Sequence, residues 1–271
     1  MLEILQYDFM RNAFLTAILA SIACGIIGVY VVVKKIASLT GGISHASFGG
    51  IGLGYFLGTN PLYGLIPFSL LSAVIMGLVS RRSKVSEDTA TSILWSLGMA
   101  LGIIFISMTP GYAPDLMTYL FGNILTVSTS DLHIMIALNA LIVIIVYALY
   151  KEFMAVCFDE EFALVIGVAV ERIYLLLLCL IALTIVLLIK VVGIILIIAL
   201  LTMPASLSAH YTHNLRNMMY LSICFGAVFS IMGLILSYTL DIPSGATIIL
   251  VMSAVYSIHF IYDGIKKKVH A

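Results

Sequence analysis

The chain has 271 residues, of which 62% are hydrophobic and only 10% are charged, and its mean hydropathy is +1.19. A soluble domain is usually about half apolar, with roughly a quarter of its residues charged. This chain has too few polar groups to cover a surface that faces water, so we expect an integral membrane protein in a lipid bilayer. Thirteen basic residues balance thirteen acidic ones, which excludes a chain-wide basic field for nucleic acid.

Long apolar runs divide the chain into predicted membrane spans, each close to the roughly 20 residues that a bilayer requires. An all-α polytopic protein with about nine transmembrane helices is therefore expected. The boundary at Lys190 is the weakest, because one long tilted helix over 173–209 would reduce the count to eight. The nine predicted spans cover residues 9–33, 44–58, 61–80, 90–108, 131–150, 172–189, 191–209, 217–238 and 244–262.

The basic residues predict the orientation of these spans. Threading the nine spans alternately, with the N-terminus outside, leaves only Arg11 and Lys190 on the outer side. Such a bias toward the cytoplasm is what the positive-inside rule demands. The residues then placed in the cytoplasm are Lys34, Lys35, Arg81, Arg82, Lys84, Lys151, Arg172, Arg216, Lys266, Lys267 and Lys268.

The second predicted span is short and unusually rich in glycine. Small residues recur at every fourth position, a stripe that lets a neighbouring backbone approach closely. His45 lies beside this stripe, where it either lines a passage between helices or forms a packing hydrogen bond with a neighbouring helix. The small residues of the stripe are Gly42, Ala46, Gly50, Gly54 and Gly58.

Between Lys151 and Arg172 the apolar pattern breaks for about twenty residues, enough for a short helix at the cytoplasmic surface near 158–168. Such a helix either docks into a groove on a partner protein or is an amphipathic interfacial linker. An acidic start, one apolar side and a final glycine define it: Asp159, Glu160, Glu161, Phe162, Ala163, Ile166 and Gly167.

Other polar residues lie near the predicted span ends. Asp241 precedes the last span, where it either caps the helix or borders an outer vestibule. Near the cytoplasmic end, His210, His213 and Arg216 form either a metal exit site or a set of solvated boundary residues. Three further histidines have no recognisable pattern of partner residues in the sequence: His133, His259 and His270.

Six segments together resemble the permease subunit of bacterial ABC importers for zinc, manganese or iron. Their order and spacing carry the resemblance more than any one segment does. Within the surface helix, Glu161, Ala163 and Gly167 match the EAAxxxG pattern of importer membrane subunits, with Phe162 in place of the first alanine. The segments are ISHASFGGIGLGY (43–55), SEDTATSILWSLGMALGI (86–103), LFGNIL (120–125), FDEEFALVIGV (158–168), VVGIILIIALLTMPAS (191–206) and DIPSGATIILV (241–251).

The resemblance implies a fold similar to the cobalamin and siderophore importers, known as type II ABC importers. It also implies that residues 1–271 form a single transmembrane permease domain in the bacterial cytoplasmic (inner) membrane. The implied partners are a second copy of the chain, a cytoplasmic ABC ATPase and an extracytoplasmic metal-binding protein. We expect no permanently bound cofactor, only a transported divalent metal ion. Since the chain has no GxxxxGK[ST] phosphate cradle, we expect it not to be an enzyme.

One departure from the family affects the expected metal pathway, which runs past Asp241 and His45. The family often carries an aspartate four residues before this histidine, whereas here the position is Gly41. A lone imidazole needs ligands from other helices, or serves only as a transient coordination point. Imidazole suits zinc or iron, and oxygen-rich sites suit manganese, so the metal stays open.

Two other classes of function are weaker. An intramembrane protease would use Ser44 or Ser244 with a histidine, but the sequence has neither HExxH nor GxSxG. An ion-coupled secondary transporter often buries acids at mid-membrane, whereas every acid here lies near a predicted span end.

Overall fold

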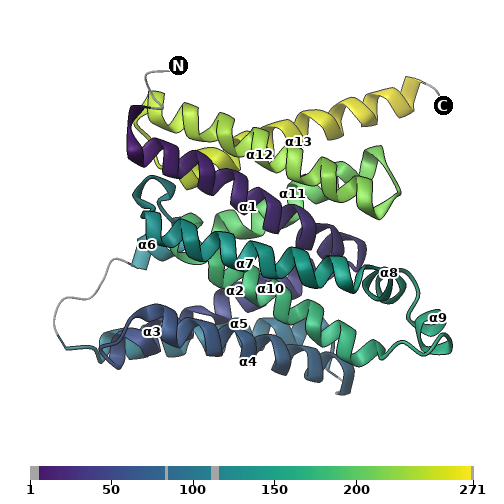
Figure 1. Cartoon of the computed structure of the whole chain (residues 1–271), viewed down its shortest axis with the longest axis horizontal. Coiled ribbons are helices and arrows are strands. Elements are labelled where there is room, and N and C mark those ends of the chain that lie inside the picture. The colour runs from purple at the N-terminus through teal and green to yellow at the C-terminus, as the bar shows by residue number, and fades with distance from the viewer. Residues whose placement is uncertain (1–5, 83–84, 111–115, 270–271) are drawn as a thin grey trace.

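The computed structural model describes residues 6–82, 85–110 and 116–269 (Figure 1). The predicted cytoplasmic Lys84 and the histidine at position 270 therefore lie outside the described residues. Within these ranges the chain is helical and has no strand, which confirms the all-α prediction. Eight helices are long and apolar enough to cross a membrane: α1 (Asp8–Val33), α4 (Pro61–Arg82), α5 (Glu87–Ser107), α7 (Thr129–Ala148), α10 (Val170–Val192), α11 (Ile194–Tyr211), α12 (Leu215–Leu240) and α13 (Ser244–Val269).

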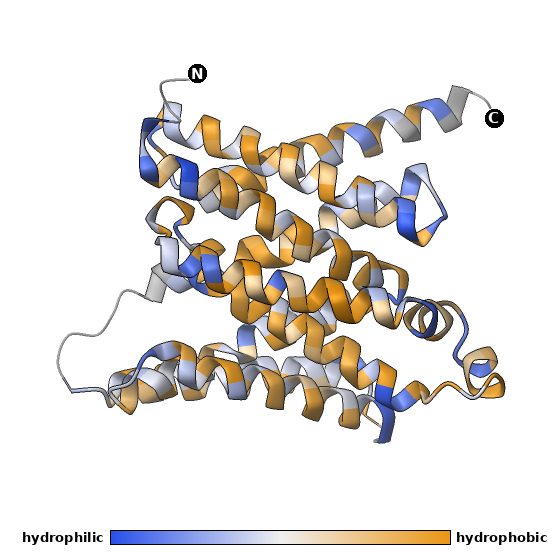
Figure 2. Cartoon of the chain, in the orientation of Figure 1, coloured by the Kyte–Doolittle hydropathy of each residue, from blue (hydrophilic) through white to orange (hydrophobic). Residues whose placement is uncertain are grey.

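Apolar residues run along the helices, and polar residues gather at the helix ends and connections (Figure 2). This distribution follows from the solvent, because hydrocarbon offers no hydrogen bonds to a polar group. Helices satisfy their own backbone groups, so only their ends need water, capping side chains or headgroups. The chain is thus built as a multi-pass membrane protein.

The predicted span 44–58 differs in detail, because it is not one continuous helix. Two short helices, α2 (Ala37–Ala46) and α3 (Phe48–Phe56), replace it and meet at Ser47. The Ser47 hydroxyl donates to the Ile43 carbonyl (2.6 Å) and accepts from the Ser69 hydroxyl (2.7 Å). A serine that bonds back onto its own helix competes with the backbone pattern and often bends the helix.

The pair α2–α3 nevertheless crosses the bundle. A Cβ added to Gly42 would lie 2.6 Å from the Met76 methyl group, and one added to Gly54 would lie 2.6 Å from the Pro61 Cα. The pair therefore runs antiparallel to α4 over most of that helix. Added to the eight long helices, it makes the ninth crossing that the sequence predicts.

Most of the small-residue stripe lies in these contacts. Gly42 and Gly50 face side chains or backbone of α4, and the Ala46 Cα lies 2.5 Å from a Cβ built on Gly98 of α5. Gly58 behaves differently, with a φ of +65° and no atom within 4 Å of its added Cβ. It follows the end of α3 in a left-handed conformation, which glycine adopts without steric cost.

We expect Gly102→Val to destabilise the chain. A Cβ on Gly102 would lie 2.7 Å from the Phe48 carbonyl oxygen, which belongs to backbone and cannot rotate away. Overpacking of this kind typically costs about 1–3 kcal/mol, so the melting temperature of the detergent-solubilised chain should fall by several degrees. Gly41→Ala is the matched control, since its Cβ meets its nearest neighbour, Ile198, at 4.0 Å. Equal melting temperatures for the two variants would contradict the close approach.

The boundary near Lys190 separates two helices, so the alternative of one long helix over 173–209 is wrong. Gly193 lies between α10 and α11 with φ +80° and ψ 159°. A Cβ there would lie 2.3 Å from the backbone nitrogen of Gly122, which follows α6 (Leu116–Phe121). Glycine is required at this crossing of two backbones.

Two groups of helices flank the middle of the bundle (Figure 1). In one group α1 packs against α11 and α12, and in the other α3 packs against α4 and α5. Between them, α10 packs on α4, and the short η2 (Ile124–Thr126) packs on α1. The helix α2, which bears His45, contacts α4, α5, α10 and α11 and so lies between the groups.

Basic side chains meet at one end of the bundle. Lys34 and Arg81, from α1 and α4, pair with the same carboxylate, and Arg216 of α12 lies 5.3 Å from the Tyr150 ring of α8 (Tyr150–Phe158). We call this the basic end. The opposite end, which carries the ion pair between Lys190 and Asp131, is called the Lys190 end.

Candidate functional site

His45 lies in the last turn of α2, two residues before the break at Ser47. Its ring stacks on the Trp95 indole of α5, with centroids 3.9 Å apart and planes 7° apart. Its Nδ1 atom is buried and has no hydrogen-bond partner in the described structure. The imidazole is thus positioned by stacking, while one ring nitrogen remains free to accept a ligand.

The neighbouring hydroxyls do not complete a metal cage. Ser44 donates to the Thr40 carbonyl (2.9 Å), and Ser47 is occupied with Ile43 and Ser69. No cluster of three or more His, Cys, Asp or Glu side chains suited to a metal ion occurs in the part of the chain that the structure describes. His45 on a single chain therefore offers one nitrogen ligand.

Asp241 lies far from His45 in the fold. It ends α12 in a left-handed conformation (φ +54°, ψ 48°), and its backbone N–H donates to the Ser237 carbonyl. The residue is exposed and lies between α12 and α13, two helices on the side of the bundle away from α3 and α5 (Figure 1). The structure does not bring Asp241 and His45 together within one chain.

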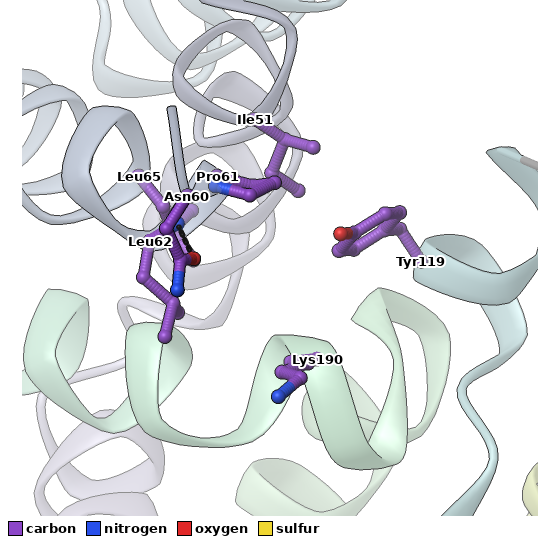
Figure 3. A pocket seen from close by; sticks show the side chains of 7 residues that line it. All are labelled: Ile51, Asn60, Pro61, Leu62, Leu65, Tyr119 and Lys190. Carbon is purple, nitrogen blue, oxygen red and sulfur yellow. Dashed lines mark hydrogen bonds between the residues drawn. The ribbon is translucent and has the colours of Figure 1, made fainter. Parts of the chain in front are cut away.

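A small pocket of about 60 Å³ opens at the Lys190 end, where α3, α4, α6 and α10 meet. Tyr119 and Lys190 face Asn60 across it (Figure 3). The Tyr119 hydroxyl lies 2.8 Å from the Tyr55 hydroxyl, and Lys190 donates to Asp131 (2.8 Å). The pocket has room for a few water molecules. Two of its lining residues, Tyr119 and Lys190, make these polar contacts.

The surface helix near 158–168 takes the form of α9 (Glu160–Val165) at the basic end. Asp159 caps it by accepting a hydrogen bond from the Phe162 backbone N–H (2.9 Å), and Gly167 follows with φ +84°. Ala163 is fully buried against α8 and α10, whereas the Phe162 side chain is 56% exposed. The remaining exposed apolar side chains of this segment are Leu164, Val165 and Ile166.

Glu160 fastens α9 to two membrane-spanning helices. Its Oε1 accepts from Lys34 Nζ at the end of α1 and from the Arg81 guanidinium (2.9 Å) at the end of α4. Arg81 also lies over the Tyr174 ring of α10, 4.2 Å from its centroid. We call Glu160, Lys34, Arg81 and Tyr174 the Glu160 clamp. These residues border a cavity of about 300 Å³.

The clamp alters the titration of Glu160. Partial burial raises the pKa of this carboxyl, but hydrogen bonds and charge from Lys34 and Arg81 lower the pKa by more, so it lies below its ordinary value. A depressed acid pKa contributes stability above the unfolded-state value, and that contribution disappears as pH falls through the folded-state pKa. The clamp is therefore intact at neutral pH and is lost in acid.

The sequence did not predict three residues that contact His45 or Glu160, namely Trp95, Lys34 and Arg81. Trp95 lies within the quoted segment 86–103, but nothing in the sequence shows that it stacks on His45. Lys34 and Arg81 were assigned only to a cytoplasmic surface, although their position beside an acidic helix is consistent with ion pairs. Contacts between residues fifty or more positions apart require the fold itself.

The protease alternative gains no support from the geometry. Ser44 is buried and its hydroxyl is committed to the Thr40 carbonyl. No hydrogen bond joins Ser44 or Ser244 to a histidine among the described residues. A nucleophile and a base within hydrogen-bond reach, which such catalysis requires, are missing there.

The chain is similar to several known membrane proteins over nearly all of its length. It is 45% identical to an uncharacterized membrane protein of Synechocystis sp., covering 95% of this chain and 92% of that protein. It is 33% identical to the manganese transport system membrane protein MntC of Halalkalibacterium halodurans, covering 96% of this chain and 89% of that protein. These similarities fit a multi-pass protein of the cytoplasmic membrane.

A solved structure and a family model agree with this. The structure of PsaBC from Streptococcus pneumoniae in complex with Fab matches with a TM-score of 0.85 and 34% identity, over 95% of this chain and 92% of that one. Residues 6–263 match the model described as the ABC 3 transport family. The resemblance to permease subunits of ABC importers is thereby confirmed, and the chain belongs to the ABC 3 transport family.

Proposed function

We propose that two copies of this chain form the membrane pathway of an ATP-binding cassette importer for a divalent transition-metal ion, zinc, manganese or iron. An extracytoplasmic metal-binding protein delivers the ion at the Lys190 end. A separate cytoplasmic ATPase acts at the basic end, since basic residues favour the cytoplasmic side. The chain, a single permease domain over residues 1–271, performs no chemistry of its own.

The observation that carries this proposal is the position of His45. Its unpartnered Nδ1 lies beside Trp95, which is 39% exposed on a largely exposed, apolar helix α5. A second copy facing α5 would bring a second imidazole to the same path. Two imidazoles and water bind a divalent ion weakly enough for release, which conduction requires.

Coupling to the ATPase is proposed to run through α9. Its exposed apolar side chains suit a groove on a partner, in the manner of helix-in-groove recognition. The Glu160 clamp would then carry a displacement of α9 to α1 and α4, and α4 holds the pair α2–α3 that bears His45. The glycine contacts allow such shifts, because few side chains interlock there.

The identity of the transported metal ion is the part of the proposal that the observations restrict least. Relatives named as manganese transport proteins make manganese the first ion to test. However, the absence of a carboxylate at Gly41 leaves nitrogen as the ligand from α2, which suits zinc or iron better. Uptake of each isotope by cells that lack other importers and express the chain with its neighbouring genes would decide among the three metals; no uptake of any would contradict the proposal.

We expect Glu160→Gln to uncouple ATP hydrolysis from transport. The amide cannot pair with the charges of Lys34 and Arg81, which are only 17% and 23% exposed. Loss of a partly buried charged partner costs about 1–3 kcal/mol. The ATPase should still bind through Phe162, while the metal transported per ATP falls several-fold in proteoliposomes.

Asp88→Asn is the matched control for this experiment, because Asp88 is exposed near the start of α5 and makes no ion pair in the described structure. Its transport ratio should equal that of the unaltered chain. Melting curves add a pH test: the Glu160→Gln chain should melt lower at neutral pH, and the gap should close in acid as Glu160 of the unaltered chain protonates. A gap that is constant with pH would argue against the clamp.

A further inference from the structure

Two histidines that are 49 positions apart meet at the basic end of α11 and α13. The rings of His210 and His259 have centroids 5.4 Å apart and planes nearly perpendicular, at 85°. The sequence suggested no partner for His259, so only the fold reveals the pair. Both residues lie outside the α2–α3 site and the Glu160 clamp.

Each imidazole has its Nδ1 atom engaged and its other nitrogen unused. His210 Nδ1 lies 2.9 Å from the Ser206 carbonyl oxygen, and His259 Nδ1 lies 3.2 Å from the Tyr211 hydroxyl. A carbonyl only accepts, so Nδ1 of His210 carries the proton and Nε2 of the neutral ring has the free lone pair. His259 Nε2 is buried without a hydrogen-bond partner.

Histidines that bind metals have this arrangement when Nδ1 donates and Nε2 keeps its lone pair, as in His210 and in the tautomer of His259 that donates to Tyr211. A metal-ligating histidine almost always donates its second ring N–H to a carbonyl, carboxylate or water, which fixes the tautomer and the ring orientation. An ion about 2 Å from each Nε2, with a near-tetrahedral angle between the two bonds, would hold the ring centroids about 5 Å apart. The observed separation is close to that value.

We propose that His210 and His259 form a low-affinity binding site for a divalent transition-metal ion at the cytoplasmic end of the chain. Each supplies Nε2, and water fills the remaining positions. The inference rests on the proposed permease function, in which the imported ion reaches the cytoplasmic end of the chain. Two protein ligands hold an ion briefly, which suits a release site, whereas three or four would trap it.

Cobalt(II) titration of the purified, full-length chain tests this site without any transport step. The chain carries a tag that has no histidines, and His45→Ala removes the nitrogen ligand of the α2–α3 site. We expect Co²⁺ to give d–d absorption bands typical of nitrogen ligands. Adding His210→Ala or His259→Ala should weaken Co²⁺ binding at least tenfold.

His133→Ala is the matched control, because this histidine is exposed on α7, away from the basic end, and its loss should leave the titration unchanged. His210→Gln and His259→Gln repeat the test with side chains closer in size, and melting curves verify that each variant is folded. Equal Co²⁺ affinity in all folded variants, or no Co²⁺ binding to the His45→Ala chain, would overturn the proposal. Failure of metal uptake in cells with Co²⁺ binding retained would contradict the proposed permease function but support this site.

Discussion

Phe162→Asp is expected to abolish association of the chain with the ATPase proposed as its partner, while leaving insertion into the membrane intact. Phe162 is exposed on α9, whereas Ala163 beside it is buried and holds the helix on the chain. An aromatic anchor at the centre of an interface commonly contributes 2 kcal/mol or more, a change in affinity of roughly 30-fold or greater. A carboxylate in an apolar groove adds a desolvation cost to that loss.

Copurification of the ATPase with a tagged chain measures this effect. Tyr63→Asp provides a control of similar chemistry, since Tyr63 is 73% exposed near the start of α4, at the end of the bundle opposite α9. It should bring down the ATPase as the unaltered chain does, and Phe162→Leu should retain most of the binding. Unchanged copurification of Phe162→Asp would refute the docking role of α9.

His45→Ala is expected to reduce metal uptake at least tenfold in a complex that still assembles. The substitution removes the nitrogen ligand of the proposed pathway and leaves the Trp95 ring without its stacking partner. Assembly should persist, because α2 is held mainly by buried apolar residues and by glycine contacts with α4 and α5. Metal-resolved uptake at fixed amounts of complex is the measurement, and normal uptake would reduce His45 to a packing residue.

Gly41→Asp is the complementary change. Position 41 is one helical turn before His45, and a Cβ there has its nearest neighbour at 4.0 Å, so an aspartate side chain can be accommodated. An oxygen ligand beside the imidazole should shift preference toward manganese relative to zinc. If the ratio of manganese to zinc uptake stays the same, ions do not bind beside His45 on α2.

The positions of the long helices along the chain could be predicted from the sequence because the hydrocarbon of the bilayer offers the backbone no hydrogen-bond partners. Every backbone group must be satisfied within its own segment, so apolar length alone marks each crossing. The boundary between α10 and α11 was predicted at Lys190, three residues before the break at Gly193, with one long helix as the alternative. The break at Ser47 was not predicted, because it depends on a hydroxyl network with Ser69 that forms only when α4 packs on α2 and α3.

Less of the candidate sites than of the long helices could be predicted from the sequence. Asp159 and Gly167 have cap chemistry that acts locally, so the extent of α9 followed from neighbouring residues. Glu160 was predicted to contact a partner protein. In the structure its carboxylate instead forms ion pairs with Lys34 and Arg81 of the same chain. Likewise the pairing of His210 with His259 depends on how α11 packs on α13, which no local pattern encodes.

The stacking of His45 on Trp95 gives the chain an intrinsic optical reporter. Trp95 is the single tryptophan among the 271 residues, and its indole lies 3.9 Å from the imidazole centroid. An ion bound to that imidazole places positive charge over the indole face, an interaction to which the ring is electronically sensitive. On the proposal that His45 binds the transported ion, emission from the purified chain should change when the ion binds, with no dye or label attached.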